Sequence, residues 1–382
     1  MEKLPKKLQS KLSERLKDGS MRSLKTSGGL IDFSSNDYLG FSRKKAILDA
    51  TTAKLKESNL QENGATGSRL LTGNHSLYKQ LEDFLAGYHN SESALVFNSG
   101  YDANIGFFSS VPQRGDTILY DELVHASIRD GIKMSNAKSY KFKHNNIDDL
   151  RVHIERSRNR NDSEIYVVTE SVFSMDGNSP DLEALVDFCA KKDCYLIVDE
   201  AHATGIYGNG KDLVSQLGLE ENVFARIITF GKALGNHGAA VLGSNDLKAY
   251  LVNFARSLIY TTALAPHTVA SVLSAYRYLE SHGKEEGSRL KENIMYFKEQ
   301  VQLLNMEGRF IESDSAIHCL VLPGNEKVKQ VSKYFQTEGF DVKPILSPTV
   351  KMGQERLRFC LHSYNTKEEI SRVLSITRNL IK

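Results

Sequence analysis

The sequence predicts an α/β protein, in which a large domain with a mostly parallel sheet is followed by a smaller α+β domain. Short Val- and Ile-rich segments alternate with amphipathic, helix-like segments over residues 30–243, a pattern typical of parallel strands covered by helices. The composition changes after Ala265 and Pro266, where a long helical stretch leads into short strands. A chain of 382 residues is also long enough for two domains.

The elements of the large domain are predicted in a regular order. Leu4, Leu8, Leu12 and Leu16 recur every fourth residue, so the chain begins with an amphipathic helix that we expect to pack on the body of the protein. Strands are expected at 30–34, 94–98, 117–120, 139–142, 165–169, 195–198, 226–230 and 239–243. Helices between most of them are expected at 77–87, 104–109, 125–134, 147–158 and 182–192.

The smaller domain follows from the remaining segments. A helical stretch at 268–304 precedes strands at 317–322, 341–342 and 356–361, with helices at 327–339 and 367–381. We therefore expect an N-terminal helix and connector at 1–36, the large domain at 37–265 and the small domain at 266–382.

Composition and charge exclude several classes of function. The chain is 40% hydrophobic and 25% charged, as globular proteins are, and its net charge of +2 gives no basic field for nucleic acid. No segment has the length of a membrane span or the apolar region of a secretory signal, and acidic residues near the start disfavour a transit peptide. The four cysteines have no metal-ligand spacing and are expected to be reduced thiols in the cytoplasm.

Two strand ends carry the residues that pyridoxal phosphate (PLP) chemistry requires. Asp199 follows the strand at 195–198, and Lys232 follows the strand at 226–230 inside a loop of small residues. In PLP enzymes a lysine forms a Schiff base with the cofactor, and a carboxylate keeps the pyridine nitrogen protonated so that the ring accepts electrons. A lone loop lysine is ordinarily only solvated, but its pairing with a strand-end aspartate favours a cofactor site beyond the C-terminal ends of the strands.

Further residues near these strand ends are candidates for the same site. Gly100 and Tyr101 open a helix after a strand, where backbone N–H groups can bind a phosphate, although such junctions are also common turns. His125 heads a helix, where its ring could stack on a pyridine ring or only cap the helix. The other candidates are Thr229, Thr261 and Thr262 for the phosphate, and Ser174 and His202 for the ring oxygen.

Two other motifs bear on the choice of ligand. The glycine-rich segment 64–73 has no P-loop lysine, so we expect no nucleotide triphosphate site there, and its glycines could let the backbone approach a ligand or another subunit. Arg356 and Arg358 are expected on opposite faces of one strand. One of them could bind a substrate carboxylate with two parallel hydrogen bonds, and the alternative is a surface charge pair.

Taken together and in this order, these motifs resemble those of the α-oxoamine synthases, which are PLP-dependent transferases of fold type I. The resemblance runs from about Asp32 to the C-terminus and rests on segments 36–40, 64–73, 170–177, 199–205 and 229–232. Segments 229–242 and 254–260 are most similar to the family member that uses L-alanine and a pimeloyl thioester.

The resemblance implies a role for each candidate residue. Lys232 is the Schiff-base lysine and Asp199 is the partner of the pyridine nitrogen. By position, His125 stacks on the ring, and His202 and Ser174 contact the ring oxygen. The phosphate is bound by Gly100, Tyr101 and Thr229. On the substrate side, Asn36 and Arg358 lie at the amino-acid carboxylate, whereas Thr349 and Arg22 face the acyl substrate.

The implied activity is the condensation of L-alanine with an acyl thioester of coenzyme A or acyl carrier protein, with loss of CO2, by a homodimer. Three alternatives remain open. A sibling enzyme would use glycine or serine in place of alanine. A non-catalytic subunit of the same fold should lack the lysine or the aspartate, and a nucleotide-binding doubly wound protein should have a G-x-G-x-x-G motif after its first strand.

Overall fold

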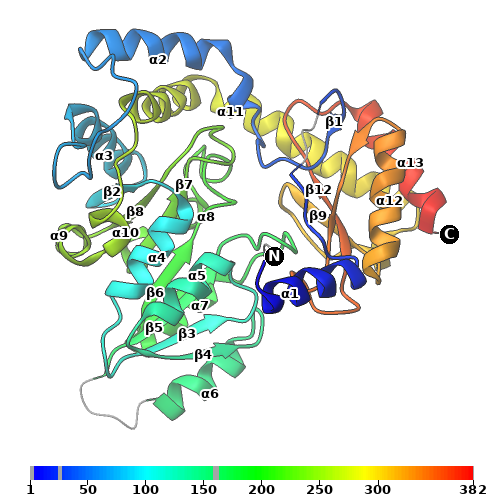
Figure 1. Ribbon diagram of the computed structural model, residues 1–382, viewed down its shortest axis with the longest axis horizontal. Helices are drawn as coiled ribbons and strands as arrows, with labels where there is room; N and C mark the ends of the chain where they lie inside the picture. Colours follow the sequence, from blue (N-terminus) through cyan, green and yellow to red (C-terminus); the bar gives the residue numbers. More distant parts are fainter. Residues whose placement is uncertain (1–3, 25–27, 158–162, 382) are drawn as a thin grey trace. The chain divides into compact units, whose positions relative to one another are not determined.

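The computed structural model describes residues 4–24, 28–157 and 163–381 of the chain. It consists of two compact units (Figure 1). The larger unit comprises residues 36–174 and 179–288, and the smaller unit comprises residues 1–35, 175–178 and 289–382. Residue 266, where we expected the small domain to begin, is the first residue of helix α11 (Pro266–Leu303), whereas the two units separate inside this helix, after Ser288.

The larger unit is built on a sheet that has seven strands among the described residues. In spatial order they are β2 (Ser93–Phe97), β8 (Ala239–Gly243), β7 (Ala225–Thr229), β6 (Tyr195–Asp199), β5 (Ile165–Glu170), β3 (Thr117–Asp121) and β4 (Lys138–Phe142). Strand β8 runs antiparallel to both of its neighbours, and the pairs from β7 to β4 are parallel. The mostly parallel α/β sheet expected from the sequence is therefore confirmed.

Helices connect these strands, and polar caps define where several of them begin. They are α2 (Lys45–Glu57), α3 (Ser76–Tyr88), α4 (Gly100–Ser110), α5 (Ala126–Met134), α6 (Ile147–Ser157), α7 (Leu182–Lys191), α8 (Leu213–Leu217), α9 (Asn245–Phe254) and α10 (Arg256–Ile259). Ser99, Asp181 and Ser244 accept backbone N–H bonds at the starts of α4, α7 and α9, respectively. Such caps satisfy backbone donors that have no partner within the helix.

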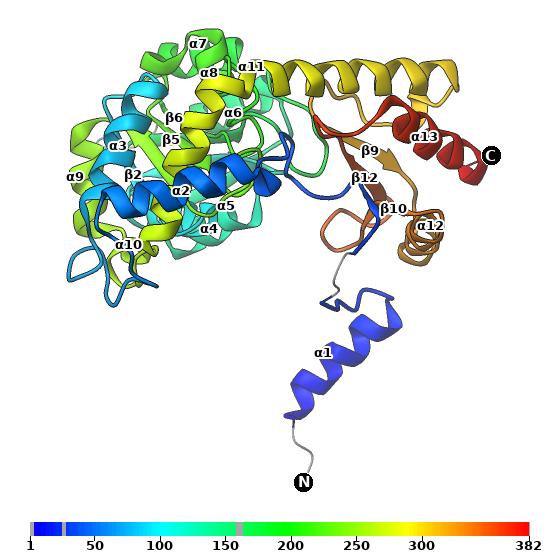
Figure 2. The ribbon, with the colours of Figure 1, turned by 90° about the horizontal axis from the view of Figure 1, so that it is seen from above.

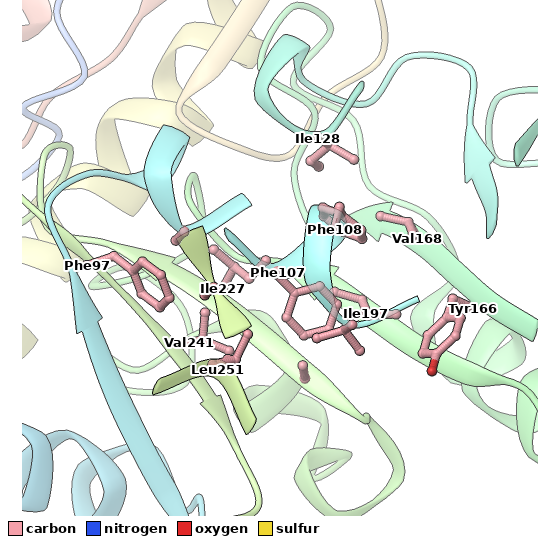
Figure 3. Packing of buried hydrophobic residues seen from close by; sticks show 14 of the residues in the cluster. Phe97, Phe107, Phe108, Ile128, Tyr166, Val168, Ile197, Ile227, Val241 and Leu251 are labelled. Carbon is pink, nitrogen blue, oxygen red and sulfur yellow. The ribbon is translucent and has the colours of Figure 1, made fainter. Parts of the chain in front are cut away.

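The core of the larger unit lies where α4 and α5 pack against the sheet (Figure 3). Phe107 and Phe108 of α4 and Ile128 of α5 are fully buried with Ile197 and Ile227 of the central strands. Burial of each such side chain contributes about 1.5–3 kcal/mol relative to exposure. This packing fixes the position of α4 and α5 over the ends of the strands that carry the candidate residues.

The smaller unit combines a three-stranded antiparallel sheet with a short parallel pair. Strand β12 (Arg356–Cys360) lies between β11 (Lys343–Ile345) and β9 (Ile317–Val321). Figure 2 shows β12 beside β9. Strand β1 (Ile31–Asp32) pairs with β10 (Phe340–Asp341). The helices of this unit are α1 (Lys6–Lys17), α12 (Asn325–Thr337), α13 (Lys367–Ile381) and the end of α11.

The N-terminal helix forms as expected, but its apolar face is not covered. Leu8, Leu12 and Leu16 are 47%, 45% and 70% exposed, and α1 contains no buried residue. The expectation that this helix packs on the body of the protein is therefore wrong. Its leucine periodicity specifies an apolar face, but it does not specify that the same chain covers that face. Within the described residues, no helix is both long enough and apolar enough to cross a bilayer.

A buried ion cluster lies in the larger unit, away from the strand ends. The Asp212 carboxylate accepts hydrogen bonds from Arg226 Nη1 at 2.9 Å, and His89 Nδ1 lies 2.8 Å from the same oxygen. The three side chains are almost completely buried. Burial alone raises the pKa of Asp212, but the His89 hydrogen bond and the Arg226 charge outweigh it and hold this pKa well below its usual value.

We predict that Asp212→Asn lowers the free energy of unfolding at neutral pH by about 3–5 kcal/mol, because Arg226 would keep a buried charge without its counter-ion. Urea unfolding measures this loss. The pKa of Asp212 is lowered on folding. The free energy of unfolding of the wild type should therefore exceed that of the variant above pH 3.8, and this difference should disappear as the pH falls below 3.8. Asp83→Asn, in an exposed pair with Lys79, is the control. Equal losses in the two variants would contradict the prediction.

Candidate active site

Three neighbouring strands of the larger unit end in polar residues at one edge of the sheet. Glu170, Asp199 and Thr229 are the last residues of β5, β6 and β7. Glu170 and Asp199 are register partners, so their side chains lie on the same side of the sheet. All three residues are buried. This edge is where ligands bind in open α/β sheets.

The Asp199 carboxylate begins a hydrogen-bonded chain that reaches the two helices above the sheet. Its Oδ2 accepts a bond of 2.9 Å from Asn104 Nδ2 of α4, and its Oδ1 accepts one of 3.0 Å from the backbone N–H of Ala201. Asn104 Nδ2 also lies 3.0 Å from the Ser127 hydroxyl oxygen, which is 2.8 Å from His125 Nδ1. The chain therefore fixes both the carboxylate and the orientation of the histidine ring.

His125 stands at the N-cap of α5, so the sequence was compatible with both of its expected roles. Its backbone N–H donates to Glu170 Oε1 at 2.5 Å, and the residue keeps exposed surface. Protein atoms crowd around the ring and lower the pKa of His125; Asp199 opposes this effect and Lys232 adds to it. The imidazole is therefore neutral at pH 7, as a ring that stacks on a pyridine should be.

Glu170 is a buried carboxyl group beside Asp199. Burial is the largest cause that raises the pKa of Glu170 to about 8, and the Asp199 charge raises it further, whereas Lys232 opposes both. The sequence placed Glu170 at a strand end but indicated no role for it. Because two adjacent buried carboxylates would repel each other, Glu170 holds a proton beside Asp199.

Lys232 lies in a tight loop between β7 and β8. The backbone N–H of Gly235 donates to the Lys232 carbonyl at 2.8 Å, and that of Asn236 donates to the Phe230 carbonyl at 2.8 Å. Gly235 has a φ of +61°, and a Cβ there would overlap the backbone of Phe41 and Ser42, so the loop requires glycine at this position. The Lys232 charge lowers the pKa of both His125 and Glu170, so Lys232 lies close to these two residues and to Asp199.

The first turn of α4 lies close to the end of β7, where we expected a phosphate to bind. A Cβ at Gly100 would lie 3.7 Å from the Thr229 hydroxyl oxygen, so the start of α4 approaches Thr229 closely. Asn98 follows the last residue of β2. Its Nδ2 donates to the Thr261 hydroxyl at 3.1 Å and to the Thr262 carbonyl at 2.6 Å, so both threonines lie at the end of β2. The Tyr101 hydroxyl donates to Asp130 at 3.0 Å.

Other predicted residues of the larger unit also lie near these strand ends. His202 follows β6 and is 5% exposed, and its Nδ1 lies 2.7 Å from the Tyr38 hydroxyl. The same hydroxyl donates to Asn36 Oδ1 at 3.2 Å. Ser174 is buried four residues after β5. Sequence reasoning missed Asn104, Ser127 and Tyr38, because no local pattern distinguishes a polar residue that bonds across the fold from one that faces solvent.

The three remaining predicted residues belong to the smaller unit. Arg22 and Thr349 are exposed, and Arg358 is 6% exposed. Their contacts with substrates stay predictions. The Arg358 guanidinium lies 2.9 Å from the Cys360 sulfur, the next residue on its own face of β12.

The expectation that Arg356 and Arg358 face opposite sides is wrong. Residues two apart in a regular strand share a face, and both arginines are buried on it. Arg356 forms an ion pair with Asp176 and donates to the Met175 carbonyl at 3.1 Å. Arg356 is thus part of a buried ion pair and not of a surface charge pair.

Comparison with known proteins agrees with this chemistry. Residues 29–376 match the family model for aminotransferase class I and II. The chain is 40% identical over 360 residues to the 8-amino-7-oxononanoate synthase of Emericella nidulans, an alignment covering 90% of this chain and 87% of that protein. It is 34% identical over 353 residues to the 8-amino-7-oxononanoate synthase of Lysinibacillus sphaericus, covering 92% and 88%, respectively.

Solved structures show the same relationship. The serine palmitoyltransferase of S. paucimobilis, with PLP and myriocin bound, superposes with a TM-score of 0.88 at 25% identity, covering 98% of this chain and 96% of that one. The 8-amino-7-oxononanoate synthase of Francisella tularensis superposes with a TM-score of 0.78 at 29% identity, covering 92% and 98%.

The chain belongs to the aminotransferase class I and II family of PLP-dependent enzymes. Its relatives and structural neighbours identify it as a PLP-dependent acyltransferase of the α-oxoamine synthase type, which confirms the predicted fold type and cofactor. The residues present fit that cofactor. The cluster supplies a buried carboxylate for a basic ring nitrogen, a lysine for an aldehyde, a neutral imidazole for the ring face, and a helix N-terminus with a threonine hydroxyl for a phosphate.

We predict that the stability of the apoprotein depends on pH through Glu170. The folded protein holds this proton more tightly than the unfolded chain, so its contribution is present below pH 4.5 and is lost as the pH rises toward 8. Glu170→Gln removes this dependence but keeps an acceptor for the His125 N–H. The free energy of unfolding of the variant, relative to that of the wild type, should therefore increase as the pH rises over that range, by at most about 1.4 kcal/mol per pH unit.

Urea unfolding at several pH values measures this difference. Glu183→Gln, at an exposed position at the start of α7, is the matched control and should follow wild type at each pH. A Glu170→Gln difference that stays constant between pH 5 and 8 would show that this carboxyl group does not hold a proton in the folded protein.

Proposed function

We propose that the protein condenses L-alanine with a pimeloyl thioester, with loss of CO2, to give 8-amino-7-oxononanoate. The observation that carries the proposal is the chain of hydrogen bonds from Asp199 through Asn104 and Ser127 to His125, with Lys232 beside it. The substrates are proposed from the names of the relatives, of which the Emericella nidulans enzyme is 40% identical.

The bound cofactor supplies an electron sink that stabilises negative charge at the amino-acid Cα. Asp199 keeps the ring nitrogen protonated, and its hydrogen bonds from Asn104 and Ala201 fix the carboxylate in place for that task. Lys232 binds the cofactor and then removes the Cα proton as a general base. His125, neutral and fixed by Ser127, covers one face of the ring.

The other residues bind and orient. His202 and Ser174 contact the ring oxygen, and the phosphate is bound by Gly100, Tyr101 and Thr229 with Thr261 and Thr262. Asn36 and Arg358 hold the carboxylate of the amino acid, and Thr349 and Arg22 contact the acyl substrate. The protein acts as a homodimer. Segment 64–73, together with Thr261 and Thr262, contributes to the partner's site.

A second candidate is a serine-dependent sibling that uses a long-chain acyl thioester. It is favoured by the superposition on the serine palmitoyltransferase of S. paucimobilis, whose TM-score of 0.88 exceeds the 0.78 of the Francisella tularensis synthase. Sequence identity favours the first proposal, because backbone similarity reports the shared fold whereas substrate choice depends on side chains.

The discriminating experiment is an activity matrix of alanine, glycine and serine against pimeloyl, succinyl and palmitoyl thioesters, scored by thiol release and product mass. We expect alanine with the pimeloyl thioester to react fastest. Arg358→Ala should weaken amino-acid binding by about ten- to a hundredfold, because a charge-assisted hydrogen-bond pair is lost. The KM for the thioester should change little.

Arg372→Ala is the matched control, because Arg372 lies in the same unit in an exposed pair with Glu338. A preference for glycine or serine of tenfold or more would refute the alanine assignment. Equal effects of the two arginine variants on amino-acid binding would refute the role of Arg358.

A further inference from the structure

A side-chain amide links the two adjacent threonines, Thr261 and Thr262, to the start of helix α4. Asn98 lies between β2 and Ser99, which is the N-cap of α4. Its Nδ2 donates to the Thr261 hydroxyl at 3.1 Å and to the Thr262 carbonyl at 2.6 Å. The proposed reaction gives Asn98 no role, although it connects two elements that we expect at the cofactor phosphate.

The direction of both hydrogen bonds follows from the atoms that make them. A backbone carbonyl oxygen can only accept, so the Asn98 atom that lies 2.6 Å from the Thr262 carbonyl is the amide nitrogen. This nitrogen has two hydrogens and cannot accept. Thr261 Oγ1, which lies 3.1 Å from the same nitrogen, therefore accepts the second hydrogen. The hydroxyl of Thr261 keeps its own hydrogen for another partner.

The Thr261 hydroxyl is thus a donor, whereas the Asn98 amide group is not one for a ligand. Within the described residues, the Thr261 hydroxyl donates to no protein atom, and the residue is only partly buried. Both hydrogens of the Asn98 amide are already used by the two threonines. The amide therefore holds the hydroxyl group in place, and the hydroxyl group is left to bind an acceptor.

The first turn of α4 supplies further donors at the same place. Ser99 accepts the backbone N–H of Asp102 at its hydroxyl and that of Ala103 at its carbonyl, each at 3.0 Å. The N–H groups of Gly100 and Tyr101 precede these and have no acceptor in the part of the chain that the structure describes. Together with the threonine hydroxyl they give three donors near one helix N-terminus, where a phosphate binds favourably.

The backbone that carries the two threonines is also fixed on its other side. The N–H of Ala263 donates to the Gly67 carbonyl at 3.0 Å, and the N–H of Leu264 donates to the Tyr78 hydroxyl at 2.8 Å. With the main chain held in this way, the freedom left to Thr261 is rotation of its side chain. The amide described above restricts that rotation.

We propose that Asn98 is a positioning residue that orients the Thr261 hydroxyl so that it donates to the phosphate of the cofactor. The inference deepens the proposed function and rests on it for the identity of the phosphate ester. Without the amide, the hydroxyl group can turn its hydrogen away from the phosphate. Because both subunits of a homodimer have the same sequence, the inference applies whether this chain or its partner binds that phosphate.

The test compares Asn98→Ala with Asn253→Ala. Asn253 also donates its Nδ2 to a backbone carbonyl, that of Ala249 at 2.8 Å, but it lies at an exposed position of α9. Each apoprotein is titrated with PLP and with pyridoxal, which has the same ring and aldehyde but no phosphate. In Asn98→Ala the dissociation constant of PLP should rise about tenfold, as expected for the loss of one hydrogen bond to a charged group. That of pyridoxal should not change, and Asn253→Ala should bind both compounds as wild type does.

A double-variant cycle separates positioning from a general loosening of the protein. Thr261→Val removes the hydroxyl group and keeps a similar shape, whereas Thr261→Ser keeps the hydroxyl group and should retain most of the wild-type affinity for PLP. If Asn98 acts through Thr261, the double variant Asn98→Ala/Thr261→Val binds PLP no more weakly than Thr261→Val alone. Independent structural effects of about tenfold each would instead multiply to about a hundredfold.

Inorganic phosphate tests the inference separately from the cofactor chemistry. Its binding to the apoprotein, followed by 31P line broadening, should be weaker in Asn98→Ala and in Thr261→Val than in wild type. Absence of a visible absorbance band with PLP would count against the proposed function and would leave this phosphate comparison decisive. Equal phosphate affinities of wild type and Asn98→Ala would overturn the inference. An equal loss of PLP and pyridoxal binding in Asn98→Ala would overturn it as well.

Discussion

The buried carboxyl group of Asp199 is the constraint on which the rest of the site depends. A carboxylate taken out of water is costly unless donors surround it. Here Asn104 of α4 donates at 2.9 Å and the backbone of Ala201 donates at 3.0 Å. Helix α4 therefore has two functions, because its inner face holds the carboxylate and its first turn approaches Thr229. The four-residue step from Gly100 to Asn104 separates these two functions by about 6 Å along one rigid helix.

Burial is the largest cause of the shifted pKa values of Glu170 and His125 around Asp199. Glu170 pairs with it in register and keeps its proton, because burial and the neighbouring charge raise the pKa of Glu170 to about 8. His125 stays neutral because its pKa is lowered. The site thus combines a buried pair of carboxyl groups, one lysine and one neutral imidazole. That pattern suits a cofactor with a cationic ring nitrogen, and it connects the packing of α4 and α5 to the chemistry we propose.

The sequence was sufficient to predict that Asp199 and Lys232 lie at the same edge of the sheet, because each lies at the end of an apolar strand and the ends of parallel strands meet at one edge. Their roles stay predictions. It could not predict Asn104, Ser127 or Tyr38 as parts of the site. Tyr38 contacts a histidine 164 residues away, and Asn104 contacts an aspartate 95 residues away. Such bonds depend on how whole elements pack. The same limit explains the leucines of α1, whose spacing shows a face but not a partner. The error at Arg356 was different, since the two-residue repeat of a strand places it on the face of Arg358.

The central claim is that Lys232 carries the cofactor beside Asp199, and one measurement tests it most directly. The purified holoenzyme is reduced with borohydride, digested and mapped by mass spectrometry, with Lys232→Arg treated in parallel. We predict that the reduced cofactor is found on the peptide containing Lys232 and that the variant carries no such label. A label on any other lysine of the wild-type protein, or the same labelled peptide map in the variant, would contradict the account.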